Sequence, residues 1–293
     1  MIQLDGVWNL HCPARNLNIP ISIPGDVYTA LLDQKLIPDP YYSTNEKLVQ
    51  WLWQVEWIFD RKFDVKNVTI YLAFVLDLEM VDTFTTVYIN DQKALNTTSC
   101  FKFYRTNIIN FLKEGRNDIR IEFHLNYMEA RNMHDEFLPN VYPNCKNCDI
   151  PFINYIRKPQ FHAGWDWGPC IFSIGIYDHA RIYPIPKNGY HLVELSAEQI
   201  YEDNDEIRIN VDVYVHNYES VNTPTILKVK FDNEEKEITI PKSEPGEHVF
   251  NVMFSTNGKE RWNIFQFGKQ TRYELTATLF DQKITKKIGI RKL

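Results

Sequence analysis

Arg157-Lys-Pro-Gln-Phe-His-Ala-Gly-Trp-Asp-Trp-Gly-Pro169 is the stretch on which the interpretation of this chain depends. At its centre Asp166 stands between Trp165 and Trp167, and glycines and a proline flank these three residues. Glycine adopts backbone angles that other residues avoid, and proline stops a strand or a helix from continuing. We therefore expect a shaped loop here rather than regular structure. The residues expected to shape it are Gly164, Trp167, Gly168 and Pro169.

This loop offers the chemistry of a sugar pocket. An indole face packs on the C–H face of a pyranose ring, and a carboxylate accepts charge-assisted hydrogen bonds from two neighbouring hydroxyls. A structural alternative remains, because buried aromatic side chains usually belong to a core. In that alternative the tryptophans plug the end of a β-sandwich and Asp166 pairs with Arg157.

The six residues from Gly164 to Pro169 resemble the Gly-Trp-Asp-Trp-Gly-Pro signature of the β-mannosidases of glycoside hydrolase family 2. Further stretches resemble, in the same order, the sugar-binding domain that opens these enzymes. They are Leu4-Asp5-Gly6-Val7-Trp8, Ile23-Pro24-Gly25-Asp26-Val27, Leu36-Ile37-Pro38-Asp39-Pro40-Tyr41-Tyr42, Gln50-Trp51, Trp57, Val81-Asp82-Thr83-Phe84, Gly115-Arg116-Asn117-Asp118 and Arg157-Lys158-Pro159-Gln160. Two stretches depart from the family pattern: Asn90-Asp91, where the family usually has Asn-Gly, and Asn140 to Cys148.

The resemblance implies a role for each residue of the loop. In the family the aspartate holds hydroxyls of the terminal mannose and an indole walls the subsite, so these roles fall to Asp166 and Trp165. Trp167 is expected to pack inward. Family 2 enzymes are retaining glycosidases whose two catalytic glutamates lie on a (β/α)8 barrel that follows the domains resembled here. The chain stops at Leu293, where that barrel would begin, so we expect no catalytic residue in it and no activity by itself.

The pattern of the first part, residues 1–183, predicts an antiparallel sandwich of jelly-roll type, which the resemblance makes galactose-binding-like. Asp26 is a good N-cap for a short helix over 27–34. Trp53, Val55, Trp57 and Phe59 alternate as one face of a strand over 51–63. Further strands are expected over 68–76, 83–89, 101–109 and 119–125, and a long loop over Met128 to Asp149.

The pattern of the second part, residues 184–293, predicts an immunoglobulin-like sandwich. Pro184, Pro186 and Lys187-Asn188-Gly189 read as a linker. After it the alternation becomes regular, and about seven short strands fit into this length. One strand face is expected to consist of Ile207, Ile209, Val211, Val213 and Val215. The end of the chain resembles the final strands of the immunoglobulin-like domain of the same family.

Charge and hydropathy narrow the possible partners. The net charge of −6 and the pI near 5.8 argue against nucleic acid or an anionic membrane surface as the main partner. No apolar run approaches the roughly 20 residues of a membrane span. The first residues lack the basic start and apolar stretch of a signal peptide, so we expect a cytoplasmic protein.

The sequence predicts neither a cofactor nor a metal. The five cysteines are an odd number, which fits reduced thiols. Cys145 and Cys148 have the spacing of half a zinc site, but no second pair follows at a suitable distance. No phosphate loop, metalloprotease helix or serine nucleophile elbow appears. The pairs Asn45-Glu46 and Asn233-Glu234 stand in a loop and in a hairpin turn, where we expect solvated side chains.

Three functions remain open. The leading one is the non-catalytic N-terminal part of a β-mannosidase-type hydrolase, which binds a mannoside weakly alone and requires a (β/α)8 barrel, for which a separate polypeptide is one candidate partner. The second is a stand-alone carbohydrate-binding or adaptor protein without hydrolytic role. The third is an autonomous hydrolase that uses Asp166 with an unidentified partner, which the requirement for two carboxyls disfavours.

Overall fold

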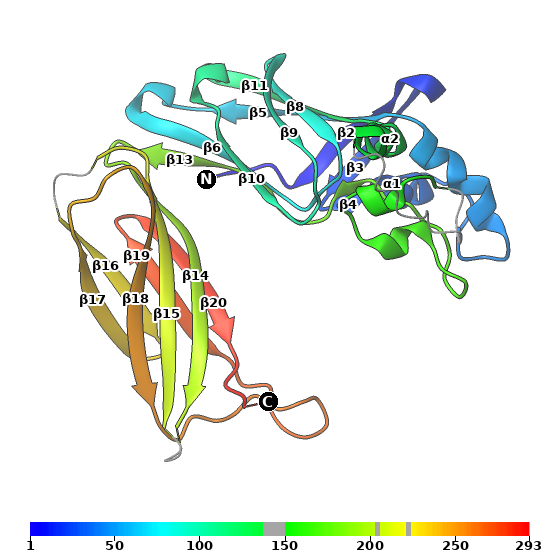
Figure 1. Ribbon diagram of the computed structural model, residues 1–293. Coiled ribbons are helices and arrows are strands. Elements are labelled where there is room, and N and C mark those ends of the chain that lie inside the picture. Colours follow the sequence, from blue (N-terminus) through cyan, green and yellow to red (C-terminus); the bar gives the residue numbers. More distant parts are fainter. Residues whose placement is uncertain (137–149, 203–205, 221–223, 293) are drawn as a thin grey trace. The chain divides into compact units, whose positions relative to one another are not determined.

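The computed structural model of the protein describes residues 1–136, 150–202, 206–220 and 224–292. These residues form two compact units, Met1–Pro184 and Ile185–Leu293 (Figure 1). Each unit contains an antiparallel β-sandwich with its own buried core, so the chain has the predicted all-β fold.

The first unit is built on a six-stranded sheet of order β3-β2-β5-β11-β8-β9 and a four-stranded sheet of order β1-β13-β6-β10. A small sheet of order β4-β12-β7 joins them at one end. The strands are β1 Ile2–Gln3, β2 Gly6–Cys12, β3 Leu17–Ile23, β4 Gly25–Asp26, β5 Trp57–Val65, β6 Tyr71–Glu79, β7 Val81–Asp82, β8 Thr85–Ile89, β9 Gln92–Thr97, β10 Phe103–Asn107, β11 Gly115–Phe123, β12 Gly175–Ile176 and β13 Ala180–Pro186.

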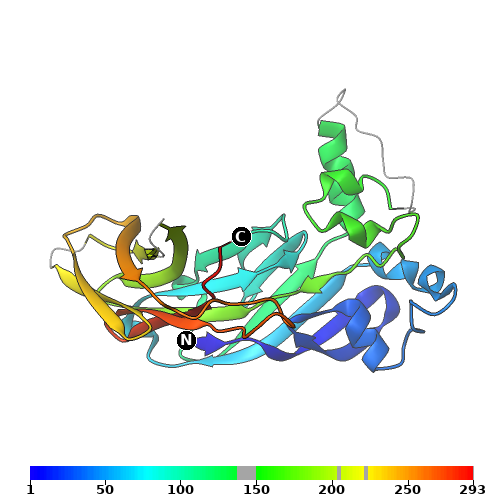
Figure 2. The same cartoon turned by 90° about the horizontal axis from the view of Figure 1, so that it is seen from below.

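The two α-helices lie at one end of the first unit, as two views of the molecule agree (Figure 1, Figure 2). The α-helices are α1 Val27–Asp33 and α2 Asn126–Glu136. The 3-10 helices are η1 Pro13–Arg15, η2 Asn45–Gln54, η3 Val68–Ile70, η4 Ile109–Phe111, η5 Ile153–Tyr155 and η6 Gln160–Ala163. The predicted short helix is confirmed, because the Asp26 carboxylate accepts hydrogen bonds from the first amides of α1.

The core of the first unit is formed by apolar side chains that alternate with polar ones along the strands. In β11 every second side chain, Ile119, Ile121 and Phe123, is buried, and the Phe123 ring lies 4.5 Å from that of Phe59 in β5. A smaller cluster of buried side chains lies apart from this core. It consists of Trp53, Phe84, Ala130, Ile150, Ile153, Ile156, Ala163 and Phe172, and we call it the loop-side cluster.

Two predictions about elements were wrong. The strand expected over 51–63 begins only at Trp57, because the preceding residues form η2 and bond locally: Gln50 Nε2 donates to Glu46 O and Trp53 Nε1 to Gln50 Oε1. The loop expected from Met128 is helical as far as Glu136. Only Asn126 and Ala130 of α2 are buried, so this helix packs through a narrow face. A narrow face needs few apolar residues, and the sequence therefore carries no clear helical period there.

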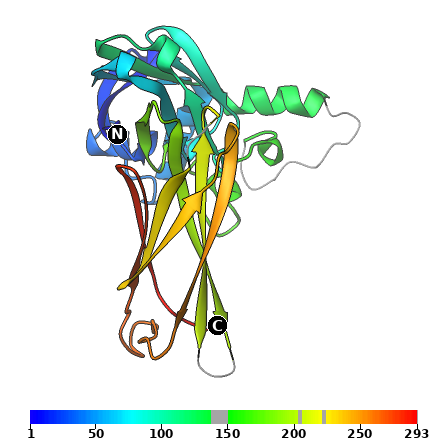
Figure 3. The same cartoon turned by 90° about the vertical axis from the view of Figure 1, so that its left-hand side faces the viewer.

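The second unit is a sandwich of a three-stranded sheet, β14-β15-β18, and a four-stranded sheet, β17-β16-β19-β20 (Figure 3). Its strands are β14 Tyr190–Tyr201, β15 Ile207–Asn217, β16 Thr225–Phe231, β17 Glu234–Ile240, β18 Gly246–Thr256, β19 Tyr273–Leu279 and β20 Gln282–Ile288. The predicted face of β15 is confirmed, because its five alternating apolar side chains are all buried.

Candidate functional site: the tryptophan loop and its hollow

The tryptophan loop, Gly164 to Pro169, is a tight turn that follows η6. Trp165 N donates to Gly168 O at 3.0 Å and Gly168 N donates to Trp165 O at 3.3 Å, so these residues pair across the turn. Asp166 and Trp167 therefore form its tip. Gly164 has φ +79°, and a Cβ there would lie 3.1 Å from the Cys170 backbone, so this position requires glycine. At Gly168 the nearest atoms are 4.0 Å away, and space does not require glycine.

The tip of the loop is exposed. Trp165 is 54% exposed and Trp167 is 83% exposed. The expectation that Trp167 packs inward was wrong, because a tip residue of so short a turn has no core within reach. Asp166 is exposed and makes no hydrogen bond or ion pair with any residue in the described part of the chain.

The structural alternative for the loop is also wrong. The two indoles do not plug the sandwich, and the Arg157 guanidinium lies over the Phe101 ring at 5.8 Å rather than on Asp166. The carboxylate of Asp166 thus keeps its hydrogen-bonding capacity for a ligand.

The tryptophan loop walls a hollow of about 410 Å³ within the first unit. This volume lies in the range of small-ligand pockets. Four aromatic side chains exposed by at least half of their surface, Tyr41, Phe161, Trp165 and Trp167, stand around it. The remaining lining residues are Asp26, Tyr28, Thr29, Leu32, Pro40, His162, Gly168, Pro169, Ile171 and Ser173. Asp166 is not among them, so the loop offers the carboxylate and the hollow as two adjoining binding features.

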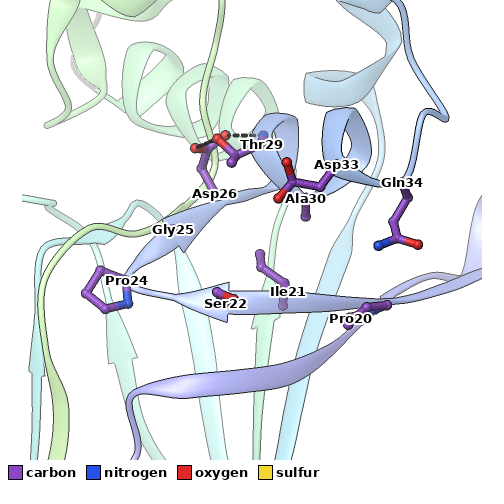
Figure 4. Close-up of a pocket in the computed structure, with 10 residues that line it drawn as sticks. All are labelled: Pro20, Ile21, Ser22, Pro24, Gly25, Asp26, Thr29, Ala30, Asp33 and Gln34. Carbon is purple, nitrogen blue, oxygen red and sulfur yellow. Dashed lines mark hydrogen bonds between the residues drawn. The ribbon is translucent and has the colours of Figure 1, made fainter.

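Helix α1 contributes Tyr28, Thr29 and Leu32 to this hollow, and its residues Thr29, Ala30 and Asp33 line a smaller one of about 160 Å³ (Figure 4). Asp26 and Thr29 line both. Asp26 Oδ1 accepts from Tyr28 N at 2.8 Å and from Thr29 N at 3.2 Å, and Oδ2 accepts from Thr29 Oγ1 at 2.7 Å. These bonds commit the Asp26 carboxylate to capping the helix, so it fixes the wall rather than binding a ligand.

A buried charge pair lies at the base of the tryptophan loop. Lys158 Nζ is 3.0 Å from Asp82 Oδ2, and both side chains are 0% exposed. Lys158 Nζ also donates to Ser173 O at 2.6 Å and lies 3.8 Å from the centre of the Phe172 ring. Since Lys158 precedes the loop and Ser173 follows it, this ammonium joins the two ends of the segment that carries the loop.

Electrostatics keep Asp82 ionised. Burial disfavours the charged form, but the Lys158 ammonium and the surrounding hydrogen bonds hold the pKa of this carboxyl below its ordinary value. One of these bonds comes from Tyr177, whose hydroxyl donates to Asp82 Oδ2 at 2.7 Å. Burial beside this carboxylate raises the pKa of Tyr177, so the phenol stays protonated and donates.

His162 stands between this charge pair and the hollow. Its Nδ1 lies 3.6 Å from Asp82 Oδ2, and its side chain is 14% exposed. The ring makes edge-on contacts with Phe161 and Tyr177, at centroid distances of 4.7 Å and 6.2 Å. The histidine also lines the hollow, so it connects the buried carboxylate to the place where a ligand would bind.

A second tether holds the C-terminal end of the loop. Glu46 Oε2 accepts from Cys170 N at 3.1 Å, and Gln50 Nε2 donates to Cys170 O at 2.8 Å. Glu46 is therefore not the solvated side chain that was expected; it anchors the loop from η2.

Sequence reasoning identified the loop but missed what supports it. Asp82 and Lys158 stand in two of the stretches that carried the family resemblance, and the structure brings these stretches together. An available signal was Asp82 in the mostly apolar run from Ala73 to Phe84, because a buried charge needs a partner. His162 carried no separate signal.

The described residues contain no group of three or more His, Cys, Asp and Glu side chains that could hold a metal ion. Cys145 and Cys148, like the whole stretch Asn140 to Cys148, lie outside the described residues. Within the ranges that the structure describes, no helix is long and apolar enough to cross a membrane.

The chain is similar to known proteins in sequence and in fold. Residues 8–178 match the model of the family described as glycosyl hydrolase 2 galactose-binding domain-like. The chain is 25% identical to a probable β-mannosidase of Caenorhabditis elegans over 304 residues, which cover 99% of this chain and 34% of the relative. It is 29% identical to β-mannosidase B of Thermothelomyces thermophilus over 311 residues, which cover 100% of this chain and 34% of the relative.

Among solved structures, a β-D-mannosidase of Dictyoglomus thermophilum shares the fold. The TM-score is 0.84 at 24% identity, covering 99% of this chain and 36% of that one. This likeness extends over both sandwiches, in the order that the sequence predicted. The chain spans about a third of the length of the curated relatives it matches.

Proposed function

Because the chain belongs to the glycosyl hydrolase 2 galactose-binding domain-like family, we propose that it is the non-catalytic N-terminal part of a β-mannosidase-type glycoside hydrolase. In this proposal the tryptophan loop supplies one wall of the subsite for a terminal β-D-mannose. Two curated relatives of this name that align with nearly the whole chain support the assignment of substrate class.

One observation carries the proposal: the Asp166 carboxylate, which has no partner among the described residues, stands between two exposed indoles. Asp166 accepts hydrogen bonds from two neighbouring sugar hydroxyls, because the described residues leave it no other partner. Trp165 offers its face to the C–H groups of the ring. The tethers at Lys158 and Glu46 keep the loop in place without a ligand, which reduces the entropy lost on binding.

Hydrolysis itself needs groups beyond this loop. A retaining glycosidase uses two carboxyls about 5–5.5 Å apart, one as acid/base and one as nucleophile. We assign both to a (β/α)8 barrel, on a longer form of this polypeptide or on a second chain. The 293 residues alone should therefore give no turnover of an aryl β-mannoside.

The test combines this chain with the barrel region of a related β-mannosidase in one cell and scores complex formation and mannoside hydrolysis. Asp166→Asn removes the charge and is expected to lower turnover by about 10²-fold while the complex still forms. The matched control is Asp33→Asn, an exposed aspartate that lines only the smaller hollow, and it should leave turnover unchanged. If the complex forms and Asp166→Asn hydrolyses as fast as the wild type, the loop is only structural.

A second function is favoured by a different observation. The aromatic hollow lies entirely within the first unit, so the unit alone offers a sugar site. One charge-assisted pair and one exposed stacking contact contribute about 2.5–4 kcal/mol gross, while association costs at least about 4 kcal/mol. The gain and the cost nearly cancel, so the proposed hydrolase part alone should bind methyl β-D-mannopyranoside no tighter than with a millimolar dissociation constant. Micromolar binding by the isolated chain would favour a stand-alone carbohydrate-binding protein.

A further inference from the structure

His162 has two ring nitrogens in different surroundings. Nδ1 is buried and makes no hydrogen bond within the described residues, although the Asp82 carboxylate lies 3.6 Å away. Nε2 makes no hydrogen bond in these residues either, but it is not among the fully buried polar atoms. Because His162 lines the hollow, Nε2 is the polar atom that its ring can offer to a bound molecule.

The Asp82 carboxylate determines which nitrogen carries the proton. A neutral imidazole has one N–H, and a bare lone pair on Nδ1 would face a negative charge. The proton therefore belongs on Nδ1, and Nε2 becomes an acceptor, as when a carboxylate fixes the tautomer of a metal-binding histidine. Lys158 and Tyr177 already donate to Asp82 Oδ2, so they hold this oxygen in place beside the ring.

We propose that His162 is a further sugar-contacting residue, which accepts a hydrogen bond from a ring hydroxyl through Nε2, and that Asp82 is its positioning residue. The proposal rests on the function proposed above and extends the subsite from the Asp166 side of the tryptophan loop into the hollow. The ligand class is a neutral pyranose, because its hydroxyls can donate to Nε2 while its C–H face stacks on Trp165.

A purely structural histidine would look different. A buried ring in a core satisfies its nitrogens within the fold, because an unpaired buried polar group costs about 1–3 kcal/mol. Nδ1 instead stands just beyond hydrogen-bonding distance of Asp82, and such contacts often shorten only in the ligand complex. A small shift of the ring on sugar binding would close the Nδ1–Asp82 contact and bring Nε2 to the ligand.

The first test uses NMR on the 293-residue chain with ¹⁵N-labelled histidine. The two ring nitrogens of His162 should show the Nδ1–H tautomer, and methyl β-D-mannopyranoside should shift the Nε2 resonance. His11 is the matched control, because it also contacts an aspartate, Asp60, but lines neither described hollow. A His162 ring protonated on Nε2, in the free and in the bound protein, overturns the proposal.

The second test measures affinity. His162→Ala should weaken binding of methyl β-D-mannopyranoside roughly three- to tenfold, the effect of one hydrogen bond to a neutral group. Among the monodeoxy analogues, one should bind His162→Ala and wild type equally well, because it lacks the hydroxyl that contacts Nε2. His11→Gln should bind all of these sugars as the wild type does.

The outcomes separate the two proposals. If the sugar shifts the Trp165 indole signal and Asp166→Asn abolishes binding, while His162→Ala binds unchanged, only the role of His162 is overturned. If no sugar signal changes up to the solubility limit, the role of His162 in this chain is overturned, and the Asp166→Asn assay with the barrel region decides the proposed function separately.

Discussion

Asp82 and Lys158 show how a single pair of residues supports the candidate site. Both side chains are fully buried. Lys158, which precedes the tryptophan loop, donates a hydrogen bond to Ser173 O, which follows it. Removing one partner of such a pair leaves an uncompensated charge in a medium of low polarity, which costs far more than losing a surface pair.

We expect Lys158→Met to destabilise the first unit by about 3–5 kcal/mol, since the unbranched apolar side chain fills most of the space but leaves Asp82 without its cation. Urea unfolding monitored by circular dichroism measures this loss. Lys228→Met is the control, because the exposed Lys228–Glu237 pair at 2.7 Å should matter little. Equal midpoints for the two variants would contradict the structural role of Lys158.

Asp82 also predicts a dependence of stability on pH. Its folded-state pKa is lower than the unfolded one, so the unfolded chain binds more protons as the pH falls. This contribution to stability is present above about pH 4 and is lost as the pH falls through the folded-state pKa. The Asp82 carboxyl carbon, followed by NMR, should titrate below the ordinary value of 3.8. A midpoint above that value would show that Lys158 does not hold the charge.

At the residue scale the sequence predicted which residues to look at, but not their contacts. The residue types of Trp165 and Asp166 indicated a sugar site, which stays a prediction; the structure shows that both side chains are exposed. The orientation of Trp167 and the pairing of Asp82 with Lys158 depend on the folded backbone. No local pattern contains this information.

The tryptophan loop is the element whose shape matters most. Its entry at Gly164 combines a positive φ with close contact to Cys170, whereas its exit at Gly168 has neither. These two glycines therefore offer a matched pair of substitutions.

Gly164→Ala should destabilise the protein by about 1–3 kcal/mol, because an L-residue at this φ is strained and its Cβ would displace Cys170. It should also weaken sugar binding, because the whole turn would shift. Gly168→Ala should be close to neutral in both measurements, thermal unfolding and sugar titration. If both variants behave alike, the loop adapts its backbone and Gly164 does not determine its shape.

Strands in which apolar and polar residues alternate could be predicted from the sequence. Segments such as η2, whose side chains hydrogen-bond to residues three or four positions away, could not. Trp53 and Trp57 belong to one alternating pattern in the sequence, but they pack in different clusters: Trp53 in the loop-side cluster and Trp57 in the main core. The alternation of apolar residues in the sequence thus runs on through η2, where there is no strand, and for this reason the predicted strand began too early. In β15, by contrast, one face is buried from end to end, so the alternation in the sequence matches the alternation of buried and partly exposed side chains in the strand.

At the scale of the whole molecule the chain consists of two separate cores. The core clusters of the two units share no residue, and β13 crosses the border at Pro184. β13 pairs with β1 through Arg181 and Ile182, before the border, whereas its last residues, Ile185 and Pro186, belong to the second unit. Lys187, Asn188 and Gly189 form a turn between β13 and β14.

Limited trypsin digestion should cut after Lys187 before other sites, and the resulting fragment of residues 188–293 should unfold cooperatively by itself. The reason is the complete sandwich of seven strands after this point. Dispersed amide signals in the NMR spectrum of the fragment check its folding. A fragment with the narrow signals of an unfolded chain would show that the second core depends on the first.

The exposure of the loop tryptophans also has an optical consequence. Of the seven tryptophans, Trp8 and Trp57 are almost completely buried, whereas Trp165 and Trp167 are the two most exposed. An indole in water emits at longer wavelength than one in a core, and iodide quenches only those that it can reach. The long-wavelength part of the tryptophan fluorescence therefore comes mainly from Trp165 and Trp167. A sugar that covers these rings should shift that emission to the blue and protect it from iodide, so the protein carries its own reporter of occupancy.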